Sequence, residues 1–109
     1  METPEFLSAA YGLLDDAERA LLVDYLASNP AGGDVIPGSG GIRKLRWRLS
    51  GRGKRGGTRV IYFYHNRQMP LFLLTAYAKN QRSDLSQAER NAFRQLTLLL
   101  VISFGRNNR

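Results

Sequence analysis

The chain has 109 residues, of which 43% are hydrophobic, and its 16 basic and 9 acidic residues give a formal net charge of +7. This length and composition fit a single folded domain, 1–109, and exclude a disordered basic tail. The absence of cysteine excludes disulfides and thiolate metal sites.

The termini and the apolar runs give no sign of export or membrane insertion. Acidic residues stand near the N-terminus, where a secretory signal needs cations. The longest apolar run, near 98–102, is far shorter than the ~20 residues of a membrane span. We therefore expect a cytoplasmic protein that has no membrane partner.

The charges are distributed unevenly along the chain. Between Asp34 and Asp84 there is no acidic residue, yet this stretch holds eleven of the sixteen Lys and Arg residues. The first 34 residues carry seven acids against Arg19 alone. A sheet built from the basic stretch would carry a field aimed at a polyanion, and nucleic acid is the first candidate.

Two short helices are predicted at the start of the chain. Thr3 can cap the first, since a proline tolerates the first turn and an acid suits the positive end of the helix dipole. Asp15 and Glu18 form a capping box for the second. Residues 31–41 contain five glycines and a proline, which predicts a loop without regular structure.

Three strands follow, joined by short turns. Residues 42–49 alternate apolar and cationic side chains, which predicts a half-buried strand. The strand predicted over 58–64 places Arg59 on the same face as apolar residues. Residues 71–78 are nearly all apolar and predict a central, covered strand. The first strand has an apolar face with Leu45, Trp47 and Leu49 and a cationic face with Lys44, Arg46 and Arg48.

A third capping box, formed by Ser86 and Glu89, predicts a C-terminal helix. The stretch 98–104 is unusually apolar and has lost helical amphipathicity. The order of elements predicts an α+β fold: a small antiparallel sheet, a meander of three to four strands, with two N-terminal helices and one C-terminal helix. We expect the helices to cover one face and the cations to lie on the other face or at the rim.

The residue types that the chain lacks limit the kinds of site and reaction that it could support. With one histidine, no cysteine and no cluster of carboxylates, no metal site is expected, and no cofactor. The glycines of 51–57 lack the Gly-Lys-Ser/Thr ending of a phosphate-binding loop and precede a strand. The basic stretch has no carboxylate for a paired-carboxylate hydrolase.

Lys, Arg and Tyr suit one reaction, the cutting of RNA by attack of the 2′-hydroxyl on the adjacent phosphorus. A lysine ringed by cations has a lowered pKa and can act as a base. Arginine supplies a fixed fork for the charge of the phosphorane, and tyrosine can stack on a base.

Four blocks of the sequence together resemble RelE-like toxins, in particular the HigB-type branch. They are PGSGGIRKLRW at 37–47, GRGKRGGTRVIY at 51–62, LLTAYAK at 73–79 and DLSQAE at 84–89. The resemblance covers roughly residues 5 to 97. It implies the toxin of a bacterial type II toxin–antitoxin pair, with a small antiparallel sheet flanked by helices, that cleaves mRNA on the ribosome. It also implies a cognate antitoxin, in this branch usually a helix-turn-helix protein of the HigA type.

The resemblance assigns roles position by position. Lys54 stands where the family has a functional basic residue, and Arg59 corresponds to the arginine that contacts the scissile phosphate. Lys79 corresponds to a second active-site cation, and Tyr77 precedes it on the same strand. The RelE branch itself has an arginine after that lysine and a tyrosine on the last helix, whereas this chain has Asn80 and no tyrosine beyond Tyr77. Which of Lys54 and Lys79 is the general base therefore stays open.

The other cations of the basic stretch are predicted to contact the RNA backbone. They are Arg43, Lys44, Arg46, Arg48, Arg52, Arg55 and Arg82. A plain solvated strand face is the alternative for these residues. Two functions of other classes also stay open: a catalytically inactive RNA- or ribosome-binding module, and a protein that only binds an antitoxin and co-regulates its operon. The apolar stretch 98–104 departs from the polar last helix common in the family, and a truncated or frame-shifted end is one hypothesis for it.

Overall fold

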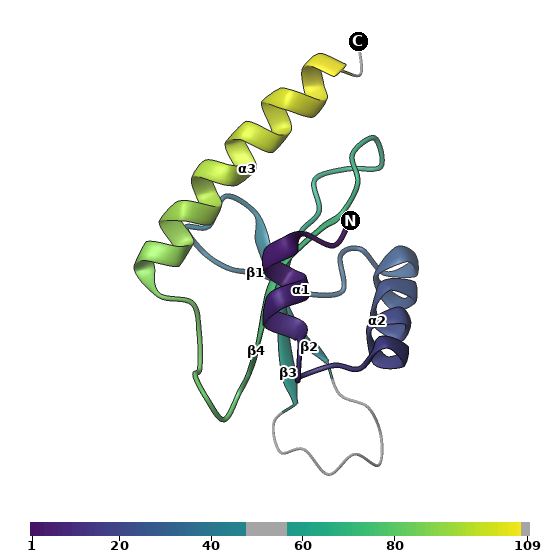
Figure 1. Cartoon of the computed structure of the whole chain (residues 1–109). Helices are drawn as coiled ribbons and strands as arrows, with labels where there is room; N and C mark the ends of the chain where they lie inside the picture. Colours follow the sequence, from purple (N-terminus) through teal and green to yellow (C-terminus); the bar gives the residue numbers. More distant parts are fainter. Residues whose placement is uncertain (48–56, 108–109) are drawn as a thin grey trace.

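The described part of the chain contains three helices and four strands, whose arrangement is drawn in Figure 1. The computed structural model describes residues 1–47 and 57–107, with side chains through 104. The elements are α1 (Pro4–Ala10), α2 (Asp16–Ser28), β1 (Asp34–Val35), β2 (Ile42–Trp47), β3 (Thr58–Phe63), β4 (Phe72–Ala78) and α3 (Gln87–Asn107). The predicted α+β fold, with its helix–helix–sheet–helix order, is confirmed.

The three predicted helix starts are confirmed in atomic detail. The Thr3 hydroxyl accepts a hydrogen bond from the amide three residues on, at 3.1 Å. In α2, Asp15 Oδ1 accepts from the Glu18 amide at 2.8 Å and Glu18 Oε1 accepts from the Asp15 amide at 3.2 Å. Ser86 and Glu89 exchange the same pair of bonds before α3, at 3.1 and 2.9 Å. These caps fix where each helix begins, because they satisfy amides that have no partner inside the helix.

The four strands form one antiparallel sheet in the order β1-β2-β3-β4. β3 is central and all six of its residues are buried. The expectation that 71–78 forms a central strand is wrong, since β4 lies at the edge. Its edge is covered instead by the first residues of the chain: the Thr3 amide donates to the Leu73 carbonyl at 3.2 Å. The prediction that residues 31–41 lack regular structure is also wrong, because strand β1 lies within that segment.

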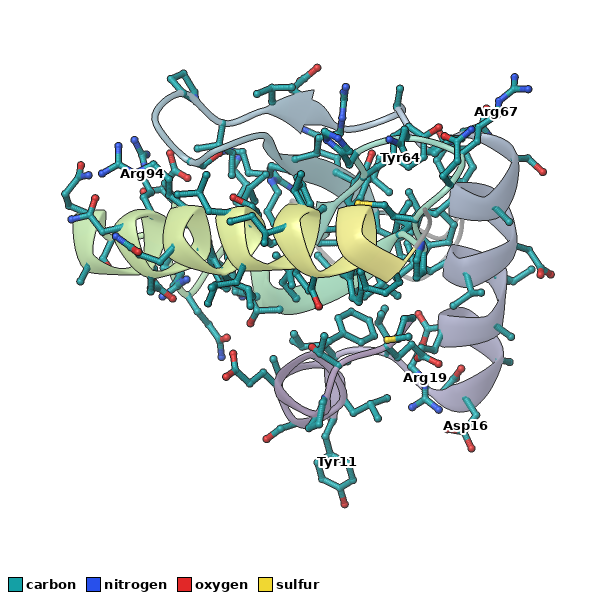
Figure 2. All side chains as sticks on the ribbon, turned by 90° about the horizontal axis from the view of Figure 1, so that it is seen from above. Tyr11, Asp16, Arg19, Tyr64, Arg67 and Arg94 are labelled. Atoms are coloured by element: carbon teal, nitrogen blue, oxygen red, sulfur yellow. The ribbon has the colours of Figure 1, made fainter. Side chains whose placement is uncertain are left out.

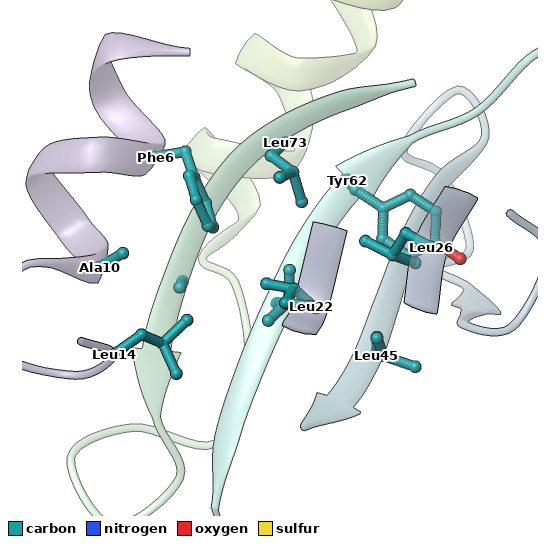
Figure 3. Close-up of a cluster of buried hydrophobic side chains, with 10 residues drawn as sticks. Phe6, Ala10, Leu14, Leu22, Leu26, Leu45, Tyr62 and Leu73 are labelled. Atoms are coloured by element: carbon teal, nitrogen blue, oxygen red, sulfur yellow. The ribbon is translucent and has the colours of Figure 1, made fainter. Parts of the chain in front are cut away.

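Helices cover both faces of the sheet, and the expectation that they cover only one is wrong. α1 and α2 pack on what we call the first face (Figure 3). The buried side chains between these helices and the sheet form one hydrophobic cluster. It consists of Phe6, Ala10, Leu14, Leu22, Leu26, Leu45, Val60, Tyr62, Leu73 and Ala76. α3 packs on the opposite, second face, where Phe93 joins apolar residues of all three longer strands. The alternating side chains of β3 are apolar on both sides, so both faces need a cover.

The apolar stretch 98–104 continues α3 as a helix, and its loss of amphipathicity is confirmed, because Leu98, Leu99 and Ile102 are exposed. Leu100 and Phe104 pack against the second face, and the Phe104 ring lies 5.7 Å from that of Phe72 in an edge-on contact. Leu99 on the other side of the helix is 65% exposed. Among the described residues, no helix combines the length and the hydropathy that a membrane crossing requires.

Candidate functional site

The second face changes from apolar to cationic along the strands. The side chains of β2 on this face are Ile42, Lys44 and Arg46, in that order. Ile42 pairs in register with Phe63, and both lie in the cluster that α3 covers. At the other end of the strand Arg46 is exposed. The β2 side chains on this face therefore change from apolar to cationic along the strand, and the cationic end is exposed.

Arg59 lies at the centre of this cationic end. It is directly opposite Arg46 on one side and Tyr77 on the other, so three predicted site residues form one cross-strand row. Only 5% of Arg59 is exposed. Two arginines on one face at neighbouring positions produce a positive field, which attracts an anion. The row is thus a preformed cationic floor that suits a phosphate.

An open hollow of about 610 Å³ lies over this floor; we call it the basic hollow. Its lining residues are Gly32, Asp34, Lys44, Leu45, Arg46, Arg59, Lys79 and Ser83. Lys79, just beyond β4, is exposed. The sheet therefore brings together four of the predicted site cations, two catalytic and two RNA-binding.

A larger hollow of about 730 Å³ lies elsewhere, between α2 and the turn that joins β3 to β4. Tyr64 and Arg67 line it near the end of α2 (Figure 2). It contains none of the predicted site residues, and most of its lining is apolar. The smaller basic hollow is the better candidate for binding an anion, because several cations converge on it.

Tyr77 is held tightly at the edge of the basic hollow. The residue is 6% exposed, and the Arg82 guanidinium carbon lies 4.6 Å from the centroid of its ring. The Tyr77 hydroxyl donates to the Ser83 carbonyl at 3.4 Å. Burial raises the pKa of Tyr77, and the charge of Asp84 raises it further, while Arg82 and Arg59 partly offset both effects. Tyr77 therefore keeps its proton at neutral pH, and little of its ring is left to stack on a base; its catalytic role stays a prediction.

The connection between β4 and α3, residues 79–86, forms one wall of the basic hollow; we call it the wall segment. Asp84 in this segment lies 3.5 Å from Lys44 Nζ and 2.9 Å from Arg90 Nη2. Arg82 forms a second ion pair, at 2.9 Å, with Glu89. Burial alone would raise the pKa of Asp84, but the Leu85 amide, Lys44 and Arg90 together hold it below its usual value.

Asp84 and Arg90 were not predicted as site residues from the sequence. The only signal was the position of Asp84 at the start of a block that resembles the toxin family. Asp84 contacts Lys44, which lines the hollow, and Arg90 contacts Asp84. These contacts form because α3 folds back over the second face, which strand alternation does not reveal.

Arg43 lies away from the basic hollow. Its Nη1 donates to the carbonyl of Gly33 at 2.7 Å and of Ala31 at 3.4 Å, so it ties β2 to the loop before β1. Its predicted contact with RNA remains a prediction. Lys54, Arg48, Arg52 and Arg55 lie outside the described residues, although the two ends of that segment, Trp47 and Thr58, pair next to the Arg46–Arg59 row.

Within 1–47 and 57–107, no group of three or more His, Cys, Asp or Glu side chains could hold a metal ion. Residues 31–103 match the model of a protein family described as RelE toxin of the RelE/RelB toxin–antitoxin system. The matched segment is more than half of the chain. It contains the whole sheet, most of α3 and every residue that lines the basic hollow.

Proposed function

The chain belongs to the RelE toxin family and is thus the toxin of a toxin–antitoxin system; on this basis we propose that it is a ribosome-dependent mRNA endonuclease that inhibits translation. The observation that carries this proposal is the convergence of Lys44, Arg46, Arg59 and Lys79 on the basic hollow, with Tyr77 opposite Arg59 in the sheet. Family members are generally translation-inhibiting ribonucleases, and the hollow offers what RNA cleavage needs: several cations around one phosphate-sized position.

The proposed reaction uses a nucleophile that belongs to the substrate. The 2′-oxygen loses its proton to a base and bonds to the adjacent phosphorus, and the bond from phosphorus to the 5′-oxygen breaks as that oxygen takes up a proton. The products are a 2′,3′-cyclic phosphate and a 5′-hydroxyl. Because no water has to be activated, the chemistry needs no metal ion.

Arg59 and Lys79 take the role of stabilising the phosphorane in this proposal. Arg59 is 5% exposed between two paired strands, so its side chain has little freedom to lose when the substrate arrives. Either Lys54 or Lys79 acts as the base. Lys44, Arg46 and Arg82 contact flanking phosphates, and their positions at the rim of the hollow or on the wall segment support this.

The partners follow from the same proposal. An antitoxin partner comes with the family, and we infer that it is a helix-turn-helix protein of the HigA type and that the toxin is of the HigB type. The ribosome and its mRNA are the targets, which places the protein in the cytoplasm.

Induced expression in a bacterial host tests the proposal, with wild type compared against Arg59→Ala and the 5′ ends of a translated message mapped. Growth arrest with new in-frame cuts, both lost in Arg59→Ala at equal soluble yield, is the expected result. Arrest without cuts would favour the inactive binding module, and neither arrest nor cuts would favour the antitoxin-binding co-regulator.

A further inference from the structure

Asp84 is an acid at the basic hollow for which the proposed chemistry has no use. Its side chain is 38% exposed. Oδ1 lies 3.5 Å from Lys44 Nζ and accepts from the Leu85 amide at 2.8 Å, while Oδ2 lies 2.9 Å from Arg90 Nη2. One carboxylate thus joins β2, the wall segment and the first turns of α3.

The negative charge of the Asp84 carboxylate, taken by itself, disfavours the binding of RNA. A negative charge beside a surface that binds a polyanion repels the ligand. Asp34 also faces Lys44, across the β1–β2 pair, but among the described residues the lysine's ion pair is with Asp84. Asp84 is therefore the acid whose removal would free the Lys44 ammonium.

We propose that Asp84 is a positioning residue for RNA cleavage, which holds the Lys44 ammonium at a fixed place over the basic hollow; this inference rests on the proposed nuclease function. A lysine side chain is long and flexible, and a group that is ordered before the reaction loses less entropy in the transition state. Arg90 holds the second carboxylate oxygen and so anchors Asp84 to α3. Lys44 lines the hollow together with Arg59 and Lys79.

The proposal predicts opposite effects on binding and on rate. Asp84→Asn keeps the shape of the side chain but removes its charge. The affinity for a non-cleavable, 2′-O-methylated RNA should rise about two- to fivefold, because a repulsive charge is lost. The cleavage rate constant at saturating toxin on programmed ribosomes should fall on the order of tenfold, because Lys44 is released. A purely structural role for Asp84 would lower the active fraction without tightening the binding of RNA.

A double-mutant cycle with Lys44 isolates the positioning effect. Lys44→Ala should slow cleavage about as much as Asp84→Asn, and adding Asp84→Asn to Lys44→Ala should slow it no further. Asp84→Glu should recover part of the wild-type rate, because it keeps the charge. Asp16→Asn is the matched control: it also removes one ion-paired carboxylate, 3.5 Å from Arg19, but from α2 and far from the hollow. It should leave the rate unchanged.

The outcomes separate this inference from the function it rests on. Absence of cleavage by the unchanged protein would overturn the proposed function and this inference with it. Cleavage by the unchanged protein together with an unaltered rate for a folded Asp84→Asn would overturn this inference alone. If Asp84→Asn does not fold, the inference is tested with Lys44→Ala instead. A wild-type cleavage rate in Lys44→Ala would equally overturn the positioning role of Asp84.

Discussion

At the residue scale, Arg59 is nearly buried on a face where the other β3 side chains, Ile61 and Phe63, are apolar. The strand register sets it between Arg46 and Tyr77. Its position on an otherwise apolar face was visible from alternation alone, because every second residue of a strand shares a face. The opposing Arg46 could not be predicted in the same way, since the register between two strands depends on the connection that joins them.

Replacement of Arg59 by alanine should abolish most of the activity and leave the fold intact. The loss of a cation that contacts the transition state should raise the barrier by about 2–4 kcal/mol, a fall of roughly 10²- to 10³-fold in rate. Relief of the repulsion from Arg46 should offset part of the lost packing. Single-turnover cleavage and urea unfolding measure the two effects separately. A large loss of stability with little loss of rate per folded molecule would assign Arg59 a structural role.

The acids at the start of α3 should make stability depend on pH. For Asp84 and Glu89 burial alone would raise the pKa, but the neighbouring cations and amides lower it below the usual values of 3.8 and 4.5. A carboxylate with a lowered pKa in the folded state contributes stability above its unfolded pKa and loses that contribution as pH falls through the folded pKa. The free energy of unfolding should therefore fall as the pH drops from about 5 to 3. The fall should be shallower in Asp84→Asn, as urea titrations at each pH would show; an identical pH dependence in the variant would contradict this account.

At the element scale, α3 decides how much of the second face is covered. Its side chains pack at the apolar end of that face, as the contact of Phe104 with Phe72 shows. The cationic end stays open and becomes the basic hollow. Capping boxes predicted where this helix begins, because they are local. Its docking on the second face could not be read from the sequence, since the run 98–104 is apolar on all sides and favours no face.

Truncation of the two sides of α3 should have unequal effects. Phe104→Ala removes a partly buried ring from the contact with Phe72 and should destabilise the fold by about 1–3 kcal/mol, less than the loss of a fully buried phenylalanine. Leu99→Ala, at a position that is 65% exposed, should change stability by less than about 0.5 kcal/mol. Urea unfolding of both variants is the measurement, and equal losses would contradict the packing of 98–104 on the second face.

At the scale of the whole molecule, most of the acids lie apart from the basic hollow. Six of the seven acidic residues in the first 34 positions precede β1 and lie on or near α1 and α2, whereas Asp34 in β1 lines the hollow together with cations of the second face. Tyr11 at the end of α1 points away from the rest of the chain (Figure 2) and is 90% exposed. The sequence predicted this uneven distribution of charge, because residues of like charge that are close together in the chain remain close together in the fold. It did not predict that two acids, Asp34 and Asp84, would lie beside these cations.

The binding of RNA should weaken with salt in proportion to the cations around the hollow. Four described cations line the basic hollow. Each phosphate neutralised on a single strand contributes roughly −0.7 to the slope of log affinity against log salt concentration, so the slope should be about −3 or steeper. Lys79→Ala should make the slope shallower by about 0.7. Arg67→Ala, which removes a cation from the larger hollow, serves as the matched control and should leave the slope unchanged. Equal effects of the two variants would indicate binding by net charge alone.

In the proposed mechanism, the basic hollow promotes attack by the 2′-hydroxyl of the RNA. The most direct measurement places a single 2′-deoxyribose at the mapped cut site of a message on programmed ribosomes and analyses the ends of the products. The account predicts no cut at the deoxy position, and a 2′,3′-cyclic phosphate with a 5′-hydroxyl at the unmodified one. A cut that persists at the 2′-deoxyribose, or one that leaves a 5′-phosphate, would contradict it.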